Sequence, residues 1–381
     1  MTTIQLSDMW YSKWRWLLNL GGLFMYIGDI CTDTALAFRY FQEAQYVWSG
    51  MTAMFIITGL VINQIFSYAW FSDNMEDKQE QVMICRSKGR LLALHVFGMG
   101  IFLRYYHLLR QGYRVVWRAS SSDNANFQER HHELFCMATD LSMLKLFESF
   151  LESAPQLLLQ LYIWQGHDEW FILQYLSLVF SFFNLAWSLV DYRSCLRRSL
   201  PHIRGLPSGP PTVVYLLYKL FTITSLTLSY SLLLTLSVYT TVGLTVFWLL
   251  GTIWAHLLKT NFCTSTALEL LYRGIIGAIL VFSFFNVKGQ NTKLEIIIYY
   301  VSCTAINVST PLMLFFLKPE LKAIIFFWSV SGLIYGGSLL GLVSLVWYYH
   351  FLHPKRSDPD EVDGLGKETP SARRIRTFIK P

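Results

Sequence analysis

Carboxylates inside otherwise apolar stretches are the residues of this sequence most able to do chemistry. Asp29 and Asp33 are four residues apart, so a helix places them on one face. An ionisable side chain in a membrane helix costs about 2.5–3.5 kcal/mol on insertion scales, and it usually faces a partner or a water-filled path. The pair therefore predicts either helix-joining ion pairs or a hydrophilic route through the bilayer.

A second group lies in the apolar stretch at residues 133–164. Lys145, Glu148 and Glu152 fall within about 60° on a wheel of 3.6 residues per turn, and Asp140 lies somewhat off that face. Four carboxylates, at positions 29, 33, 148 and 152, exceed the nearby cations. We therefore favour a polar feature with a functional role, while structural ion pairing or snorkelling to the interface stays open.

Two further features of the apolar stretches concern polar groups in the membrane. Glu269 and Arg273 form an i, i+4 pair near the start of a short apolar segment. Pro155 lacks a backbone N–H, which predicts a break near the middle of its segment and freed carbonyls that need a polar environment. A simple packed kink explains Pro155 equally well.

The C-terminal tail carries the sharpest motif of the chain. Asp360-Glu361-Val362-Asp363-Gly364 matches the preferred recognition sequence of executioner caspases, with cleavage after Asp363. The motif lies in the polar stretch that begins at Pro354, which suits a protease that binds an extended segment. Cleavage would release residues 364–381, a basic fragment whose residues 371–380 could form a short helix docked on the cytosolic face.

No catalytic, metal or cofactor motif accompanies these residues. The sequence has no G-x-S-x-G, no phosphate-binding glycine loop and no H-E-x-x-H, so we expect neither an enzyme nor a bound metal or cofactor. The six cysteines form no C-x-x-C pair; packed thiols are expected, and one disulfide stays open. The sequon at Asn307 lies within an apolar run, where a glycosyltransferase has no access.

Helices that cross a membrane are needed to position these residues. Hydrophobic residues make up 53% of the 381 and charged residues only 15%, against roughly 25% in soluble proteins. Several uncharged stretches exceed the roughly 20 residues that a spanning helix needs. Ten apolar segments can be drawn, at residues 14–40, 46–72, 91–109, 133–164, 170–192, 212–238, 240–258, 267–287, 295–317 and 323–352.

Two of the ten segments are too short to cross. Only 13 uncharged residues separate Arg90 from Arg104, and 14 separate Arg273 from Lys288. Such lengths are typical of re-entrant or partly inserted elements. The sequence therefore predicts an all-α, polytopic membrane helix bundle with about eight transmembrane helices and two partly inserted ones.

The distribution of Lys and Arg predicts the topology. Lys13 and Arg15 place the N-terminus in the cytosol, and the basic loops at residues 73–90, 104–132 and 193–204 are interpreted as cytosolic, as is the C-terminus. The net charge of +6 is explained by these loops, so no nucleic-acid partner is expected. Residues 1–353 form the membrane domain, with suggested related halves 1–192 and 193–353, and residues 354–381 form a regulatory tail.

Two stretches resemble a known membrane-protein family. Glu148-Ser-Phe-Leu-Glu152-Ser-Ala-Pro155-Gln156-Leu-Leu-Leu-Gln160 is similar to the signature of the XK-related proteins, and Gly28-Asp29-Ile30-Cys31-Thr32-Asp33 is similar to their first span. The likeness extends over about residues 10–355. Together with the caspase sequence, it resembles the apoptotic branch of that family.

The resemblance implies an energy-independent phospholipid scramblase of the plasma membrane that exposes phosphatidylserine once executioner caspases remove the tail. Its membrane-embedded acidic positions correspond to Asp29, Asp33, Glu148 and Glu152. Phospholipids, caspases and an accessory single-span membrane protein are the partners it suggests. Two other functions stay open from the residues alone: a channel or solute transporter gated by proteolysis, and a membrane scaffold that transports nothing.

Overall fold

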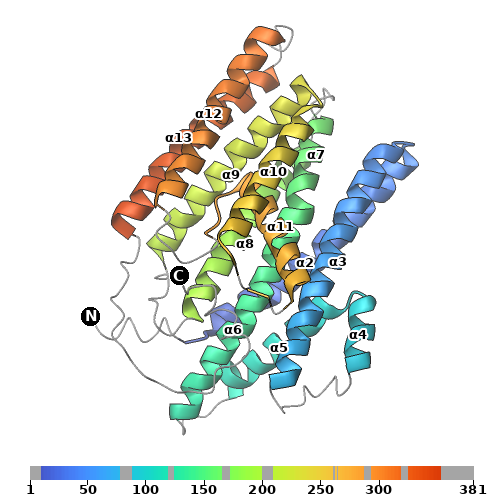
Figure 1. Ribbon diagram of the computed structural model, residues 1–381, viewed down its shortest axis with the longest axis vertical. Coiled ribbons are helices and arrows are strands. Elements are labelled where there is room, and N and C mark those ends of the chain that lie inside the picture. The colour runs from blue at the N-terminus through green and yellow to red at the C-terminus, as the bar shows by residue number, and fades with distance from the viewer. Residues whose placement is uncertain are drawn as a thin grey trace. The chain divides into compact units, whose positions relative to one another are not determined.

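The computed structural model confirms the all-α prediction. It describes residues 10–77, 88–118, 124–164, 172–199, 209–260, 262–263, 265–286, 293–318 and 325–352, and the regular elements in this part of the chain are helices (Figure 1). In chain order they are α2 (Lys13–Gln42), α3 (Tyr46–Asp77), α4 (Lys88–Val96), α5 (Gly100–Tyr113), the π-helix η1 (Arg114–Arg118), α6 (Asn124–Glu148), the π-helix η2 (Ser149–Ser153), α7 (Ala154–Trp164), α8 (Ile172–Arg198), α9 (Pro210–Leu236), α10 (Thr240–Leu257), α11 (Thr266–Phe282), α12 (Lys293–Leu317), α13 (Ile325–Trp347) and the π-helix η4 (Tyr348–Leu352).

The helices form two compact units. Unit 1 holds α2 to α6 and the last residues of α8, from Asp191 onward. Unit 2 holds η2, α7, the rest of α8, and α9 to η4. This division follows packing and does not address whether residues 1–192 and 193–353 are related halves, which stays a prediction.

Unit 1 begins with a tight helical hairpin. The side chain of Ser12 accepts a hydrogen bond from the backbone N–H of Arg15 at 3.2 Å and so caps the start of α2. Ala44, at φ 57°, ends the helix in the left-handed conformation and turns the chain into α3. Ser49 Oγ then donates to the carbonyl of Ala37 at 2.8 Å, which sets the register of the α2–α3 pair.

The short segment at residues 91–109 is sharply bent. Helices α4 and α5 meet at 115° across a break that contains Gly98, at φ 76°. Gln64 of α3 holds the break, because its amide nitrogen donates to the Gly98 carbonyl at 3.1 Å and its amide oxygen accepts from Gly100 N at 2.9 Å. A straight span is therefore excluded, and the geometry agrees with the predicted partly inserted element.

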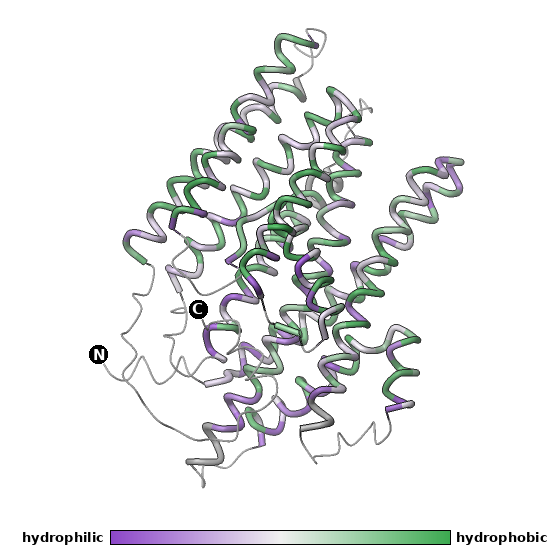
Figure 2. The backbone as a smooth tube through the Cα atoms, in the orientation of Figure 1, coloured by the Kyte–Doolittle hydropathy of each residue, from purple (hydrophilic) through white to green (hydrophobic). Residues whose placement is uncertain are grey.

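Unit 2 is arranged around α9. This helix starts where Gly209, at φ 113°, precedes Pro210 and Pro211, residues suited to the first helical turn. It packs against α7, α12 and α13, while α10 and α11 form a separate hairpin. Figure 2 shows long hydrophobic stretches along α10, α12 and α13, as lipid-facing helices require.

Five helices of the described residues are long and apolar enough to cross a membrane. They are those at Tyr46–Asp73, Pro210–Leu236, Thr240–Leu257, Lys293–Leu317 and Phe327–Leu352, and the bent pair α4–α5 would make a sixth. Helix α11, with 17 residues, reaches about 25 Å, short of the roughly 30 Å hydrocarbon core, as predicted for the second short segment. Segments 14–40, 133–164 and 170–192 form long helices that carry polar residues, so the count of eight spans stays a prediction.

Helices α10 and α11 approach closely at two glycines. A Cβ on Gly251 would lie 3.2 Å from the Cα of Gly277, and a Cβ on Gly277 would lie 2.8 Å from the carbonyl oxygen of Trp248. Small residues at such a contact let two membrane helices pack backbone to backbone. By contrast, a Cβ on Gly274 would meet no heavy atom within 4 Å.

We predict that Gly277→Ala destabilises the protein by about 1–3 kcal/mol, because the added methyl group forces the two backbones apart. The melting temperature of the purified protein in detergent measures this effect. Gly274→Ala, one turn earlier in the same helix, is the matched control and should leave the melting temperature unchanged or slightly raised. Equal melting temperatures for the two variants would contradict the close packing of α10 and α11.

Candidate functional site

Helix α2 turns a polar face toward the interior of unit 1. The side chains that it buries recur every three or four residues or at multiples of that spacing: Arg15, Asn19, Tyr26, Asp33 and Tyr40. Asp29, which is half-buried, belongs to the same row. We call these six residues the polar stripe. The opposite side of the helix exposes large apolar side chains, among them Phe24, Ile27 and Phe38.

This arrangement is the reverse of a soluble amphipathic helix. In water, a helix buries its apolar side and exposes its charges, whereas α2 exposes apolar residues and buries charged ones. Lipid is the surroundings in which that pattern is stable, because polar groups find no partner there and turn inward. The prediction that Asp29 and Asp33 share one face is confirmed.

Asp140 forms an ion pair with a residue that the sequence interpretation placed elsewhere. Arg104 Nη1 lies 3.5 Å from Asp140 Oδ2, and both side chains are buried. Arg104 Nε also donates to Ser67 Oγ at 2.9 Å, and its guanidinium lies 4.3 Å from the ring centre of Phe71. The interpretation of Arg104 as part of a cytosolic loop is wrong: α5 carries it into the interior, where burial demands a carboxylate partner.

A second ion pair joins the start of α2 to α8. Arg15 Nη1 lies 2.6 Å from Asp191 Oδ1, and Arg15 Nη2 donates to Cys195 Sγ at 2.6 Å. Arg15 was interpreted only as a charge that marks the cytosolic end of the helix. Its burial and its pair with Asp191 make it a structural anchor of unit 1 as well.

The N-terminal residues before α2 continue this anchor. Asn19 Nδ2 donates to the hydroxyl group of Tyr11, and the backbone N–H of Tyr11 donates to His131 Nδ1 at 2.9 Å. Burial lowers the pKa of His131, which precedes the apolar stretch of α6. The neutral ring that this favours is the form able to accept the hydrogen bond.

Lys145 and Glu148 lie among charged and aromatic neighbours. The Lys145 ammonium is 5.0 Å from the ring centre of Tyr105, and its charged neighbours include Arg15, Asp191 and Glu148. Glu148 accepts a hydrogen bond from Asn63 Nδ2 of α3 at 3.4 Å. The structure therefore brings Lys145 and Glu148 together with the Arg15–Asp191 pair.

Pro155 does not break its segment in two. Helix α6 passes into the single π-helical segment η2 and then into α7, whose second residue is Pro155. A wide turn changes the rotation between residues, so the wheel that aligned Glu152 with Glu148 no longer applies. Glu152 lies in this π-helical segment, and only 1% of its surface is exposed.

Glu269 and Arg273 form the predicted i, i+4 pair, at 3.6 Å, but their other contacts are hydrogen bonds to the loop between α10 and α11. Glu269 Oε2 accepts the backbone N–H groups of Phe262 and Cys263, at 2.9 and 2.7 Å. Arg273 donates to the carbonyl of Thr260 at 2.7 Å. Both side chains hold the connection between α10 and α11, which favours the structural interpretation for them.

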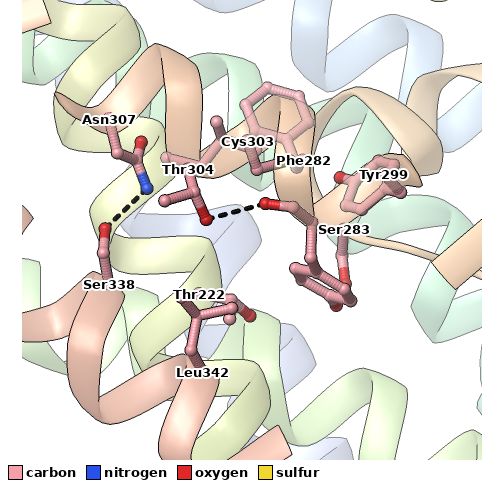
Figure 3. A pocket seen from close by; sticks show the side chains of 11 residues that line it. Thr222, Phe282, Ser283, Tyr299, Cys303, Thr304, Asn307, Ser338 and Leu342 are labelled. Atoms are coloured by element: carbon pink, nitrogen blue, oxygen red, sulfur yellow. Dashed lines mark hydrogen bonds between the residues drawn. The ribbon is translucent and has the colours of Figure 1, made fainter. Parts of the chain in front are cut away.

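Unit 2 contains a small polar cavity of its own (Figure 3). Its volume of about 10 Å³ suits about one water molecule. Asn307 bridges two helices there, accepting from Ser229 Oγ at 2.8 Å and donating to Ser338 Oγ at 2.7 Å. Asn307 is thus a buried structural residue, in agreement with the interpretation that its sequon is inaccessible.

The caspase sequence and the cysteines are the remaining predicted features. The caspase sequence, Asp360 to Gly364, lies outside the described residues, as does Cys85. In the part of the chain that the structure describes, no disulfide joins the other five cysteines: Cys31, Cys136, Cys195, Cys263 and Cys303. Within the described ranges no group of three His, Cys, Asp or Glu side chains is placed to hold a metal ion.

Comparison with known proteins shows which family this chain resembles. The model of the XK-related protein family covers residues 17–354, most of the chain. The protein belongs to the XK-related family. XK-related protein 9 of Tetraodon nigroviridis is 50% identical over 97% of this chain and 99% of its own length. XK-related protein 8 of Pan troglodytes is 30% identical over 94% of this chain and 91% of its own length, and that of Tetraodon nigroviridis is 29% identical over 95% and 89%.

In this XK-related chain, sequence reasoning missed the cations of the site more than its acids. Arg15 and Arg104 were assigned to topology, and the polar partners Asn19 and Asn63 were not considered. One signal for part of the site was present: the polar residues at positions 15, 19, 26, 29, 33 and 40 recur at helical spacing. No comparable signal marked Arg104, because its partner lies on another helix.

We predict that Arg104→Met destabilises this XK-related protein by about 3–5 kcal/mol, since it leaves Asp140 buried without its guanidinium partner. Melting temperatures of the purified variants measure the loss. Arg39→Met is the control, because Arg39 pairs with Glu43 on the surface and is 73% exposed, so its loss should cost less than about 1 kcal/mol. Adding Asp140→Asn to Arg104→Met should recover part of the stability, and a purely additive double variant would argue against the pair.

Proposed function

We propose that this protein is an energy-independent phospholipid scramblase that exposes phosphatidylserine after executioner caspases cleave its tail. The observation that carries the proposal is the polar stripe of α2. From Arg15 to Asp33 the helix rises about 27 Å, close to the roughly 30 Å of the hydrocarbon core. A polar row of this length offers partners to a headgroup over nearly the whole depth of the bilayer.

The chemistry of a phospholipid headgroup fits the residues of unit 1. Spontaneous flipping is slow because the charged head must lose its water in hydrocarbon. The carboxylates Asp29 and Asp33 suit the ammonium group of a headgroup, and the ammonium group of Lys145 suits its phosphate. Each 1.36 kcal/mol removed from the barrier raises the rate tenfold. The sequence contains no nucleotide-binding motif, so the lipids move down their gradient.

Control by the tail is the second part of the proposal. The basic fragment 364–381 docks on the cytosolic face and keeps the route closed, and cleavage after Asp363 removes the tether that keeps it concentrated there. The similar proteins bear the names XK-related protein 8 and 9, which by themselves state no activity. The proposal places the protein in the plasma membrane with both termini in the cytosol, and it leaves room for an accessory single-span subunit.

Reconstitution in vesicles that carry a fluorescent phospholipid tests the proposal. After treatment with an executioner caspase, the labelled lipid of the inner leaflet should become accessible to a membrane-impermeant quencher within minutes. Asp363→Ala is the matched control, because it removes the aspartate after which the caspase cleaves. The labelled lipid should then stay inaccessible to the quencher. Ion flux without lipid exchange would support the proteolysis-gated channel. If neither ions nor lipids move, even after a single-span partner is added, the result would support the scaffold.

We predict that Asp33→Asn lowers the rate of lipid exchange by the cleaved protein about tenfold, because the stripe loses a charge that pairs with the headgroup ammonium. The rate of quencher accessibility in the same vesicles measures the effect. Glu43→Gln, at the exposed end of the same hairpin, is the control and should leave the rate unchanged. An unaltered rate for Asp33→Asn, with normal folding, would show that the stripe is not the route.

A further inference from the structure

Unit 1 has an open groove beside α2 that the proposed function does not use. It lies between α2 and the α5–η1 segment, and its volume is about 580 Å³, within the usual range of ligand sites. Among the described residues, those that line the groove belong to these three elements. None of the polar stripe residues lines it.

One part of the groove is strongly basic and aromatic. Arg110, Arg114 and Arg118 line it, and in the described part of the chain neither Arg114 nor Arg118 has a carboxylate partner. Two tyrosines that line the groove contact these cations: the Arg110 guanidinium is 5.7 Å from the ring centre of Tyr106, and that of Arg118 is 5.7 Å from the ring centre of Tyr113. Three guanidinium groups facing one hollow form a site for an anion, and the planar donor fork of arginine suits phosphate.

The rest of the groove is apolar and lies deeper along α2. Trp16 Nε1 donates to the carbonyl of Leu109 at 2.9 Å, and the ring of Tyr26 lies 5.4 Å from that of Phe102. Helices α2 and α5 are therefore antiparallel, so the arginines lie toward the start of α2 and Phe102 lies farther along it. Leu23, which also lines the groove, is ten residues beyond Lys13, a rise of about 15 Å, or half the hydrocarbon thickness.

We infer that the groove binds one anionic phospholipid, with its phosphate among Arg110, Arg114 and Arg118 and an acyl chain along Leu23 and Phe102. Charge complementarity selects an anion, and the apolar depth selects one that carries a hydrocarbon chain. The acidic stretch of the protein's own tail, residues 357–364, also complements the arginines, but its only large apolar side chain is Val362. A lipid therefore fills the deep part of the groove better than this peptide.

Binding of short-chain lipids to the purified full-length protein in detergent tests the inference. We expect dioctanoyl phosphatidylserine to bind about tenfold more tightly than dioctanoyl phosphatidylcholine, as measured by thermophoresis. Arg114→Gln combined with Arg118→Gln should abolish this preference. Arg90→Gln, at another exposed arginine of unit 1, is the matched control and should retain it. Leu23→Ala should weaken both lipids about threefold and leave the preference between them intact.

Three outcomes would overturn the inference. Glycerophosphoserine that binds as tightly as the dioctanoyl lipid would make the groove a free-phosphate site. A synthetic peptide of residues 357–364 that displaces the lipid at lower concentration would make it the seat of the tail. A preference unchanged in the double arginine variant, with an unaltered melting temperature, would place the lipid elsewhere. Because the assay needs no transport, its failure is distinguishable from failure of the proposed scramblase activity.

Discussion

Polar groups in a bilayer must find their partners inside the protein, and most of unit 1 follows from this constraint. Helix α2 exposes Phe24 and Phe38 and buries Arg15 and Asp33, so its rotation about its own axis is determined by its charges. Pairs of opposite charge then determine which helices are neighbours. Asp191 of α8 pairs with Arg15 of α2, and Arg104 of α5 pairs with Asp140 of α6. Apolar packing fills the remaining space, but the paired charges select which helix faces which.

Residues that are neighbours on one helix could be predicted from the sequence, and residues that meet across helices could not. The common face of Asp29 and Asp33 and the pair of Glu269 with Arg273 follow from 3.6 residues per turn. Arg104 and Asp140 are 36 residues apart on different helices, and no local pattern marks them as partners. The positive-inside rule counts Lys and Arg as loop residues, and it therefore placed Arg104 in a cytosolic loop. The rule does not consider a cation that is buried and neutralised by a carboxylate.

The same inward charges explain why apolar character does not settle the number of spans. Helices α2, α6 and α8 carry inward-facing charges such as Arg15, Asp140 and Asp191, which lower their mean hydropathy, whereas α10, α12 and α13 carry few charges and are apolar enough to cross a membrane. Pro155 illustrates a related difficulty. Its missing N–H predicts a break, but a single π-helical segment at Ser149–Ser153 lets the hydrogen bonds shift by one residue while the helix continues. Sequence patterns fail at such positions because local rules are overridden where polar residues gather.

The charge balance of unit 1 bears on how an acidic route tolerates an anionic lipid. Judged from the sequence, the carboxylates exceed the cations and should repel phosphatidylserine. The contacts show where the cations lie: Arg104 pairs with Asp140, Arg15 pairs with Asp191, and Lys145 lies near Glu148, one of the four acids at positions 29, 33, 148 and 152. The acids at positions 29 and 33 then face a headgroup that carries its own ammonium group. In the proposed mechanism the phosphate meets Lys145 while the ammonium meets Asp29 and Asp33, which matches the zwitterionic charges of a headgroup. The extra carboxylate of phosphatidylserine is then the group whose hydration the route must preserve.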